Sequence, residues 1–288
     1  MVNLLHLCES MLLKWCNEDE LRVPVPLFEN FAKRNNFHIL KKCVDGRYYY
    51  RVVRCNIPVY FISGSEEKEF NFLDIADLHI GHPNFDESAL REKLAIAVSS
   101  GIERVFIAGD VFEGVCNETG ETHYYEQIEQ AYSIFKDYPL KYYVINGNHD
   151  YTFEQVFLTN PIERLATKLN SVGIEFNYFD AYLVDFVICG VIKRVMHVER
   201  QDFSKKSIFA ILKLKMFDED GMLQNTYKNV TYPVRFFQVG HIHVNVQMYY
   251  AKKMIYISQS GSFIRSEKAF ERANFISGRV IDQKVFMN

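Results

Sequence analysis

Amide, imidazole and carboxylate side chains come together in one short stretch of the chain, Asn146-Gly147-Asn148-His149-Asp150. The stretch follows the apolar run Tyr142-Tyr143-Val144-Ile145, whose β-branched and aromatic residues and closing glycine predict a buried strand. In α/β sheets, ligands bind at the carboxyl ends of the strands. This stretch is therefore the first candidate for a functional site.

Three further hydrophobic segments are predicted to be strands that end in the same kinds of polar residue. Residues 70–76 lead into Asp77-Leu78-His79, residues 105–109 lead into Asp110, and residues 234–240 lead into His241-Ile242-His243. A single ending of this kind can arise by chance, but several in one chain indicate a shared metal site. The mixed nitrogen and oxygen donors suit Mn, Fe or Zn better than Ca.

In this order, the motifs D-x-H, G-D, G-N-H-D and G-H-x-H resemble those of the calcineurin-like metallophosphoesterases. The resemblance covers about residues 70–263. Gly81 extends the first motif to D-x-H-x-G. In this form the motif most resembles the branch of the family that contains the nuclease subunit of double-strand-break repair complexes. The family resemblance implies an α/β (α+β) fold, in which a two-sheet β-sandwich is flanked by helices, and hydrolysis of phosphate esters with two divalent metal ions.

The resemblance also implies a role for each polar residue. The first ion would have Asp77, His79 and His243 as ligands. The carboxylate of Asp110 would bridge the two ions, and the second ion would also bind Asn148 and His241. His149 would face the substrate phosphate and give a proton to the leaving oxygen, and Asp150 would orient the His149 imidazole and raise its pKa. We expect Mn as the metal, with Fe or Zn as alternatives.

The family pattern requires one more histidine for the second ion, at the end of a strand between the third and fourth motifs. Residues 184–191 and 208–217 are the strands predicted there, and the second has Lys215, not histidine, near its end. Lysine must lose its proton to bind a metal, so Lys215 could contact the phosphate instead. His197 and His123 are alternative ligands, although His197 is expected to lie on the surface of an irregular segment.

The first part of the chain predicts a separate module at residues 1–62, followed by the phosphoesterase domain at residues 68–288. Apolar spacing predicts a helix over residues 2–17, Pro26 begins a second helix, and Asp45-Gly46 predicts a hairpin turn. Helix, helix and hairpin are compatible with a winged-helix-like module. Its candidate nucleic-acid contacts are seven cations: Lys33, Arg34, Lys41, Lys42, Arg47, Arg51 and Arg54. The alternative is a packing module with a solvated basic face.

Composition and charge limit the class of protein. Of the 288 residues, 48% are hydrophobic, and the net charge of −3 is unevenly distributed, since residues 1–62 hold nine Lys/Arg against six acidic residues. Six scattered cysteines without a C-x-x-C pair argue against a zinc ribbon or a disulfide scaffold and suit a reducing cytoplasm. The absence of any long apolar run predicts a soluble protein without membrane contact.

These observations favour a metal-dependent phosphodiesterase or nuclease that acts on nucleic acid. A small-molecule phosphoesterase acting on nucleotides is a second hypothesis, because the residues after 62 hold 24 Lys/Arg against 30 acidic residues. A binding or scaffold protein with a partly degraded metal site is a third, prompted by Lys215. The nuclease branch often forms homodimers and works with an ATPase partner, although the sequence identifies no surface for either.

Overall fold

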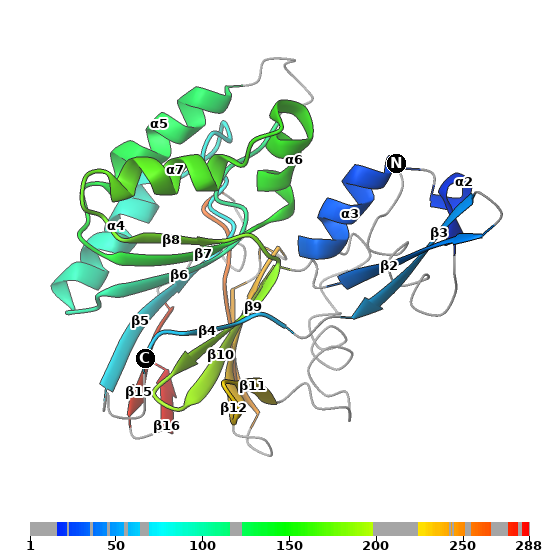
Figure 1. Cartoon of the computed structure of the whole chain (residues 1–288). Helices are drawn as coiled ribbons and strands as arrows, with labels where there is room; N and C mark the ends of the chain where they lie inside the picture. The colour runs from blue at the N-terminus through cyan, green and yellow to red at the C-terminus, as the bar shows by residue number, and fades with distance from the viewer. Residues whose placement is uncertain are drawn as a thin grey trace.

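The computed structural model of the chain describes residues 16–21, 23–34, 37–44, 47–54, 57–63, 69–115, 123–197, 224–241, 243, 245–250, 255–265, 276–281 and 284–287. Two large β-sheets pack against each other, and helices cover the outer face of one of them (Figure 1). The predicted α/β sandwich is thereby confirmed.

The first sheet has the strand order β16-β15-β5-β6-β7-β8. Its strands are β5 (Glu69–Ile75), β6 (Arg104–Ala108), β7 (Lys141–Ile145), β8 (Phe176–Phe179), β15 (Ile276–Ile281) and β16 (Lys284–Met287). Strands β5 to β8 run parallel to one another, so the carboxyl ends of β5, β6 and β7 meet at one edge. The outer face packs on α4 (Glu87–Ser99), α5 (Tyr124–Phe135) and α7 (Pro161–Asn170).

The second sheet has the strand order β13-β14-β12-β10-β9-β4, with β11 beside β12. Its strands are β4 (Val59–Phe61), β9 (Leu183–Ile188), β10 (Val191–His197), β11 (Gln224–Tyr227), β12 (Val230–Gly240), β13 (Asn245–Tyr250) and β14 (Ile255–Ser260). Strands β10 and β12 run parallel, in a register that sets His197 level with Gly240. The segment that ends in His197 and the segment that continues into His241 therefore leave this sheet side by side.

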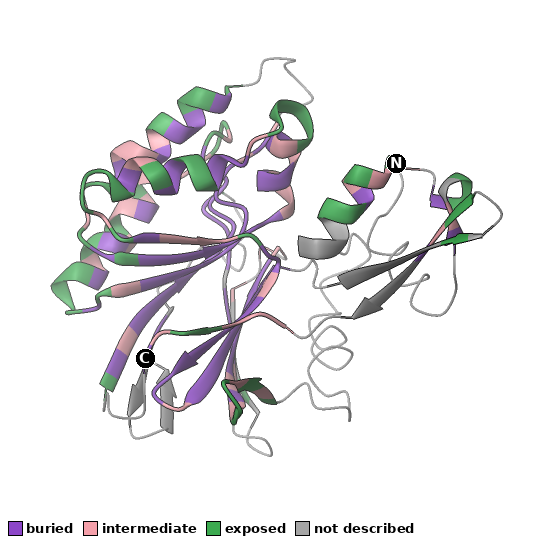
Figure 2. Cartoon of the chain, in the orientation of Figure 1, coloured by how far each residue is buried: buried purple, intermediate pink, exposed green. Residues whose placement is uncertain are grey.

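Alternation along the strands builds the apolar layer between the sheets. On β6, Phe106 and Ala108 enter this layer, whereas Val105 and Ile107 pack under the helices. The ring centroid of Phe106 lies 5.1 Å from that of Tyr143 and 5.3 Å from that of Phe186. Most residues of β5, β6, β7, β9 and β10 are buried, and these strands are largely purple in Figure 2.

A tight hairpin replaces the single strand predicted at residues 184–191. Strand β9 ends at Ile188, Cys189 and Gly190 form the turn with φ of 48° and 81°, and β10 returns antiparallel to β9. A two-residue turn with both φ values positive matches the twist of a hairpin. The prediction was wrong because the apolar residues continue across the turn and Cys-Gly is not a common turn pair. The strand predicted at residues 208–217 lies outside the described residues.

The described part of the N-terminal region forms a small sheet of its own, in the order β1-β3-β2. It comprises β1 (Cys16–Asn17), α2 (Glu18–Leu21), α3 (Val25–Arg34), β2 (Phe37–Val44) and β3 (Arg47–Arg54). The β2–β3 pairing confirms the predicted hairpin. The prediction that the first helix extends to residue 17 was wrong, because residues 16–17 form a strand that pairs with β3. The rest of that predicted helix, residues 1–15, lies outside the described residues. The winged-helix-like assignment and the boundary between 62 and 68 stay predictions.

None of the helices in the described ranges is both long and apolar enough to cross a membrane.

Phe106 tests how far stability depends on the layer between the sheets. The Phe106→Ala substitution should lower the free energy of unfolding by about 3–5 kcal/mol, because it leaves a cavity among packed rings. Val98→Ala, on the outer surface of α4, should change it by less than about 0.5 kcal/mol. Urea unfolding followed by circular dichroism measures both, and equal effects would contradict the packing described here.

Candidate metal centre

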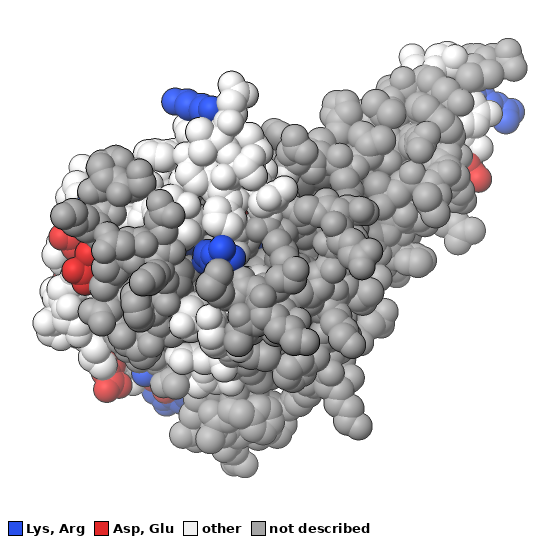
Figure 3. All heavy atoms as spheres, turned by 90° about the horizontal axis from the view of Figure 1, so that it is seen from below, with Lys and Arg blue, Asp and Glu red and all other residues white. Residues whose placement is uncertain are grey.

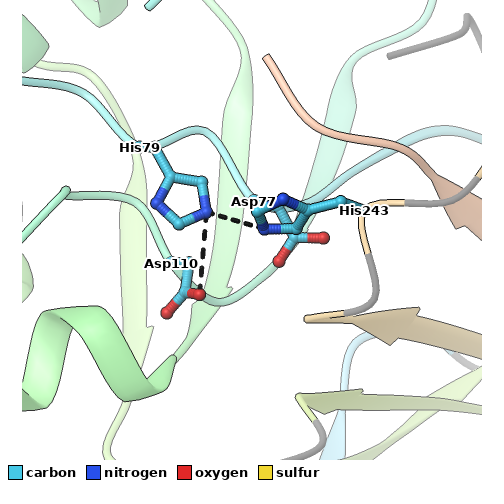
Figure 4. Close-up of side chains that lie close together, drawn as sticks. All are labelled: Asp77, His79, Asp110 and His243. Atoms are coloured by element: carbon cyan, nitrogen blue, oxygen red, sulfur yellow. Dashed lines mark hydrogen bonds and ion pairs between the residues drawn. The ribbon is translucent and has the colours of Figure 1, made fainter. Parts of the chain in front are cut away.

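Four side chains from three separate segments form the first ligand group, which consists of Asp77, His79, Asp110 and His243 (Figure 4). One ligand atom from each lies within 4.8 Å of the others. The Nε2 atoms of His79 and His243 are 2.9 Å apart, and His79 Nε2 is 3.9 Å from Asp110 Oδ2. Asp77 follows β5, Asp110 follows β6 and His243 follows β12, so the group forms where the two sheets meet.

The second ligand group consists of Asp110, Asn148, His197 and His241, and it shares Asp110 with the first. The Asn148 Oδ1 atom lies 2.8 Å from both His197 Nε2 and His241 Nδ1. His197 Nε2 is also 3.3 Å from Asp110 Oδ2. The structure thus brings all six predicted ligands together, with His197 added to them.

The surface position expected for His197 was wrong. His197 is buried at the carboxyl end of β10, and its Nδ1 contacts the Ala108 carbonyl oxygen at 2.8 Å. His197 therefore stands at a strand end in the place where a histidine was missing. Lys215 lies outside the described residues. His123 is exposed at the N-terminus of α5, where it pairs with Glu126.

Two glycines allow the segments to approach closely. A Cβ atom on Gly147 would lie 2.0 Å from the Asp110 nitrogen, and one on Gly240 would lie 2.1 Å from the Ala108 carbonyl oxygen. Atoms at such distances overlap, so any other residue would push the loops apart. The G-N-H-D and G-H-x-H motifs need their glycines for this reason.

Asp150 does not contact the imidazole of His149, so the predicted orienting role was wrong. Its buried carboxylate accepts hydrogen bonds from the backbone nitrogens of Gly147, Phe112 and Val111, at 2.9, 2.9 and 3.3 Å. Asp150 therefore joins the start of α6 (Asn148–Phe157) to the loop after β6. It fixes the backbone on both sides of the ligand groups.

Glu113, which was not among the predicted site residues, positions two histidines. Its carboxylate Oε2 lies 2.9 Å from His79 Nδ1, and its carbonyl oxygen accepts a hydrogen bond from His149 Nδ1 at 2.7 Å. A carboxylate on the second nitrogen of an imidazole fixes the ring for metal binding. The acid three residues after Asp110 was the signal in the sequence.

The electrostatics of the site favour cations. Burial lowers the pKa of His241 to about 4 and that of His243 to about 3, so both imidazoles are neutral, as metal binding requires. Burial raises the pKa of Asp77 to about 7. Burial also opposes ionisation of Asp110, but the neighbouring histidines His197, His149 and His79 together outweigh burial and hold the pKa of Asp110 well below its usual value.

The residues fit a pair of divalent ions. The Oδ2 atoms of Asp77 and Asp110 are buried without a hydrogen-bond donor, which is costly unless a cation neutralises them. Two imidazole nitrogens, one from His79 and one from His243, face each other beside them. Nitrogen and oxygen ligand atoms therefore converge around two buried carboxylate oxygens that have no hydrogen-bond partner.

The order of these residues along the chain matches a known protein family. The family model of the calcineurin-like phosphoesterases matches residues 70–250, which include every residue of both ligand groups. The chain belongs to the calcineurin-like phosphoesterase family. It is therefore a hydrolase that acts on phosphate esters. No curated protein matches the sequence.

Comparison with solved structures gives several that are similar to the chain. A conserved uncharacterised protein from Streptococcus pneumoniae, described as a predicted phosphoesterase, is 12% identical; the match covers 76% of this chain and 98% of that one, with a TM-score of 0.39. A dimetal phosphatase from Danio rerio is 10% identical over the same shares of the two chains (TM-score 0.44). Vps29 of Chaetomium thermophilum is 13% identical over 73% of this chain and 81% of that one (TM-score 0.39).

His197 provides a direct test of the second ligand group. The His197→Ala variant should bind one divalent ion per chain more weakly than the parent, by roughly 10- to 100-fold, since one imidazole is lost from that group alone. Calorimetric titration of the metal-free protein with Mn²⁺ measures this change. His123→Ala, which removes an exposed histidine, is the control and should bind metal like the parent.

Proposed function

We propose that the chain is a two-metal phosphodiesterase that cleaves nucleic acid. The observation that carries the proposal is the pair of ligand groups that share the Asp110 carboxylate. Divalent ions held there would neutralise the phosphoryl group and make water a stronger nucleophile near neutral pH. Mn is the expected metal, because both groups mix imidazole and carboxylate donors and the second group adds the amide of Asn148.

His149 is placed to handle a proton without being a metal ligand. The Glu113 carbonyl oxygen engages its Nδ1, which leaves Nε2 for the substrate. The side chain is 37% exposed, whereas its neighbour Asp150 is buried, so a phosphodiester can reach the ring. Protonated at Nε2, His149 would give its proton to the leaving oxygen.

The N-terminal hairpin supports a nucleic acid as the substrate. Strands β2 and β3 contain five Lys/Arg residues and no acidic residue. A surface with cations alone attracts the phosphates of a polyanion. Two of the neighbouring tyrosines add accessible rings, since Tyr48 is 46% exposed and Tyr49 is half-buried, whereas Tyr50 is buried. Stacking of bases on such rings is a common contact with single strands.

The register of the small sheet places its cations on two different faces. Cys16 and Tyr50 are cross-strand partners and both are buried, so their face is covered where β1 pairs with β3, although Tyr48 on the same face is exposed near the start of β3. Tyr49 is half-buried and belongs to the opposite, open face. Residues two apart on a strand share a face, and cross-strand partners do too. Positions Lys42, Arg47 and Arg51 therefore belong to the open face, and Lys41 and Arg54 to the covered one.

A small-molecule phosphoesterase is the second candidate, and the charge of the catalytic part favours it. Residues 63–288 hold 24 Lys/Arg against 30 acidic residues. On the face shown in Figure 3, the described Lys and Arg side chains lie singly and form no continuous patch. A long polyanion would need a basic path that leads to the site.

Variants of the site test the reaction. His149→Ala should lower kcat on DNA by about 10²- to 10⁴-fold while metal binding stays intact, because only the proton donor is removed. Asp110→Asn should lose both activity and metal, since it touches both ligand groups. Cleavage of DNA and of a chromogenic phosphodiester, with Mn²⁺ and after chelation, measures these effects. Turnover of the diester without any cleavage of DNA or RNA would favour the second candidate.

Paired variants of the hairpin test the nucleic-acid contact. In the inactive Asp110→Asn protein, changing Arg47 and Arg51 to Gln should weaken DNA binding and lower the slope of log affinity against log salt by about two. The matched control changes Lys41 and Arg54 to Gln and removes the same charge from the covered face. Fluorescence anisotropy at several salt concentrations measures both, and equal losses in the two variants would contradict an open binding face.

A further inference from the structure

An ion pair lies inside the otherwise apolar layer between the two sheets. Lys193 of β10 places its Nζ 2.7 and 2.9 Å from the two carboxylate oxygens of Asp74 on β5. Both side chains are fully buried. The Ser258 hydroxyl of β14 donates to Asp74 Oδ2 at 2.7 Å. We call Lys193 and Asp74 the intersheet ion pair, because one partner comes from each sheet.

Aromatic rings enclose the ammonium group. Lys193 Nζ is 4.3, 4.9 and 5.2 Å from the ring centroids of Phe72, Phe106 and Phe236. These rings also come from both sheets, and cation–π contacts at such distances are attractive. The ammonium position is thus fixed by groups on both sides of the layer.

Further polar contacts join the sheets between this pair and the metal centre. Gln238 Nε2 of β12 donates to the carbonyl oxygens of Ile75 and Phe106, at 2.8 and 2.9 Å. Beyond it, His197 contacts the Ala108 carbonyl oxygen at 2.8 Å. Lys193 and His197 share one face of β10 and lie about 13 Å apart along it. The intersheet ion pair is the inner end of a row of contacts that leads to the ligands.

A second buried ion pair on the same strand has a different geometry. Arg194, the next residue after Lys193, donates from Nε to Asp185 Oδ1 at 2.7 Å and from Nη2 to Oδ2 at 2.8 Å. Asp185 lies on β9, the neighbouring strand of the same sheet. We call it the intrasheet ion pair. It joins strands that the backbone already holds together, whereas the intersheet pair joins sheets that share no strand.

Buried ion pairs contribute little net stability, because removing charges from water costs about as much as their attraction returns. A geometric role therefore explains the intersheet pair better than a stabilising one. Both ligand groups take donors from both sheets. In the first group Asp77 and Asp110 follow strands of the first sheet and His243 follows β12 of the second; in the second group Asn148 follows β7, His197 ends β10 and His241 follows β12. Metal–ligand distances tolerate shifts of only about 0.2 Å.

We propose that Lys193 and Asp74 are positioning residues, which hold the two sheets at the spacing that the metal ligands need. This inference rests on the proposed metal centre and adds residues that touch neither metal nor substrate. Loss of the pair would let the sheets shift against each other, so that donors from the two sheets no longer reach a common ion.

The test compares two double variants with the same chemical change. Asp74→Asn with Lys193→Met removes the intersheet pair, and Asp185→Asn with Arg194→Met removes the intrasheet pair. Each removes one charge of either sign, so long-range effects on a bound cation cancel. Calorimetric titration of the metal-free, full-length proteins with Mn²⁺ should show affinity lowered at least roughly tenfold in the first variant and unchanged in the second.

Thermal unfolding of the metal-free variants separates positioning from general stability. We expect similar shifts in Tm for the two variants, together with the difference in metal affinity. Ser258→Ala, which removes only the hydroxyl donor to Asp74, should lower metal affinity in the same direction by less. Equal metal affinities in the two double variants would overturn the positioning role, whereas a parent protein that binds no Mn²⁺ would refute the metal centre itself.

Discussion

The site exists only where two separate sheets meet, and this constraint governs the rest of the structure. Neither sheet carries a complete ligand group, since the carboxylates and the amide follow one sheet and three of the histidines follow the other. Sheets that pack face to face are normally held by apolar side chains, which tolerate small sliding movements. Directional contacts such as those of Gln238 with two carbonyl oxygens restrict this sliding.

Backbone strain at the ligands shows that the surrounding packing determines their positions. Asp77, His79, Asp110, His241 and His243 all have positive φ values, between 50° and 87°. Such conformations cost about 1–3 kcal/mol each for residues other than glycine. They persist because each ligand lies within four residues of the end of a buried strand. The large core of the sandwich offsets this cost, and the left-handed residues turn the side chains toward one another.

Strand ends with polar residues were visible in the sequence, and the family resemblance that they carry predicted the six candidate ligands and the sandwich. His197 was not, for two physical reasons. The hairpin before β10 uses Cys189-Gly190, which does not interrupt the apolar pattern, and β10 contains Lys193 and Arg194, which made it look like a surface segment. Both cations are buried in ion pairs. Periodicity cannot reveal the partners of a buried charge, because these partners lie on other strands.

Asp150 shows a second limit of sequence analysis, since its type suited catalysis but its position decided otherwise. As the third residue of α6 it points back to the start of the helix, where backbone nitrogens lack partners within the helix. Two of the three nitrogens that it binds belong to the loop after Asp110. This carboxylate thus couples the bridging position to the helix that begins with Asn148 and His149.

The electrostatics connect metal uptake to the stability of the fold. Buried carboxylates of Asp77 and Asp110 repel each other, and this repulsion adds to the effect of burial on the pKa of Asp77. Without a cation, the folded chain therefore tends to retain a proton there, which a metal ion must displace. A ligand that binds only the folded state stabilises it in proportion to the logarithm of its concentration over Kd. Divalent ions would thus relieve the repulsion, and the strained loops would gain stability from the same ions that serve the reaction.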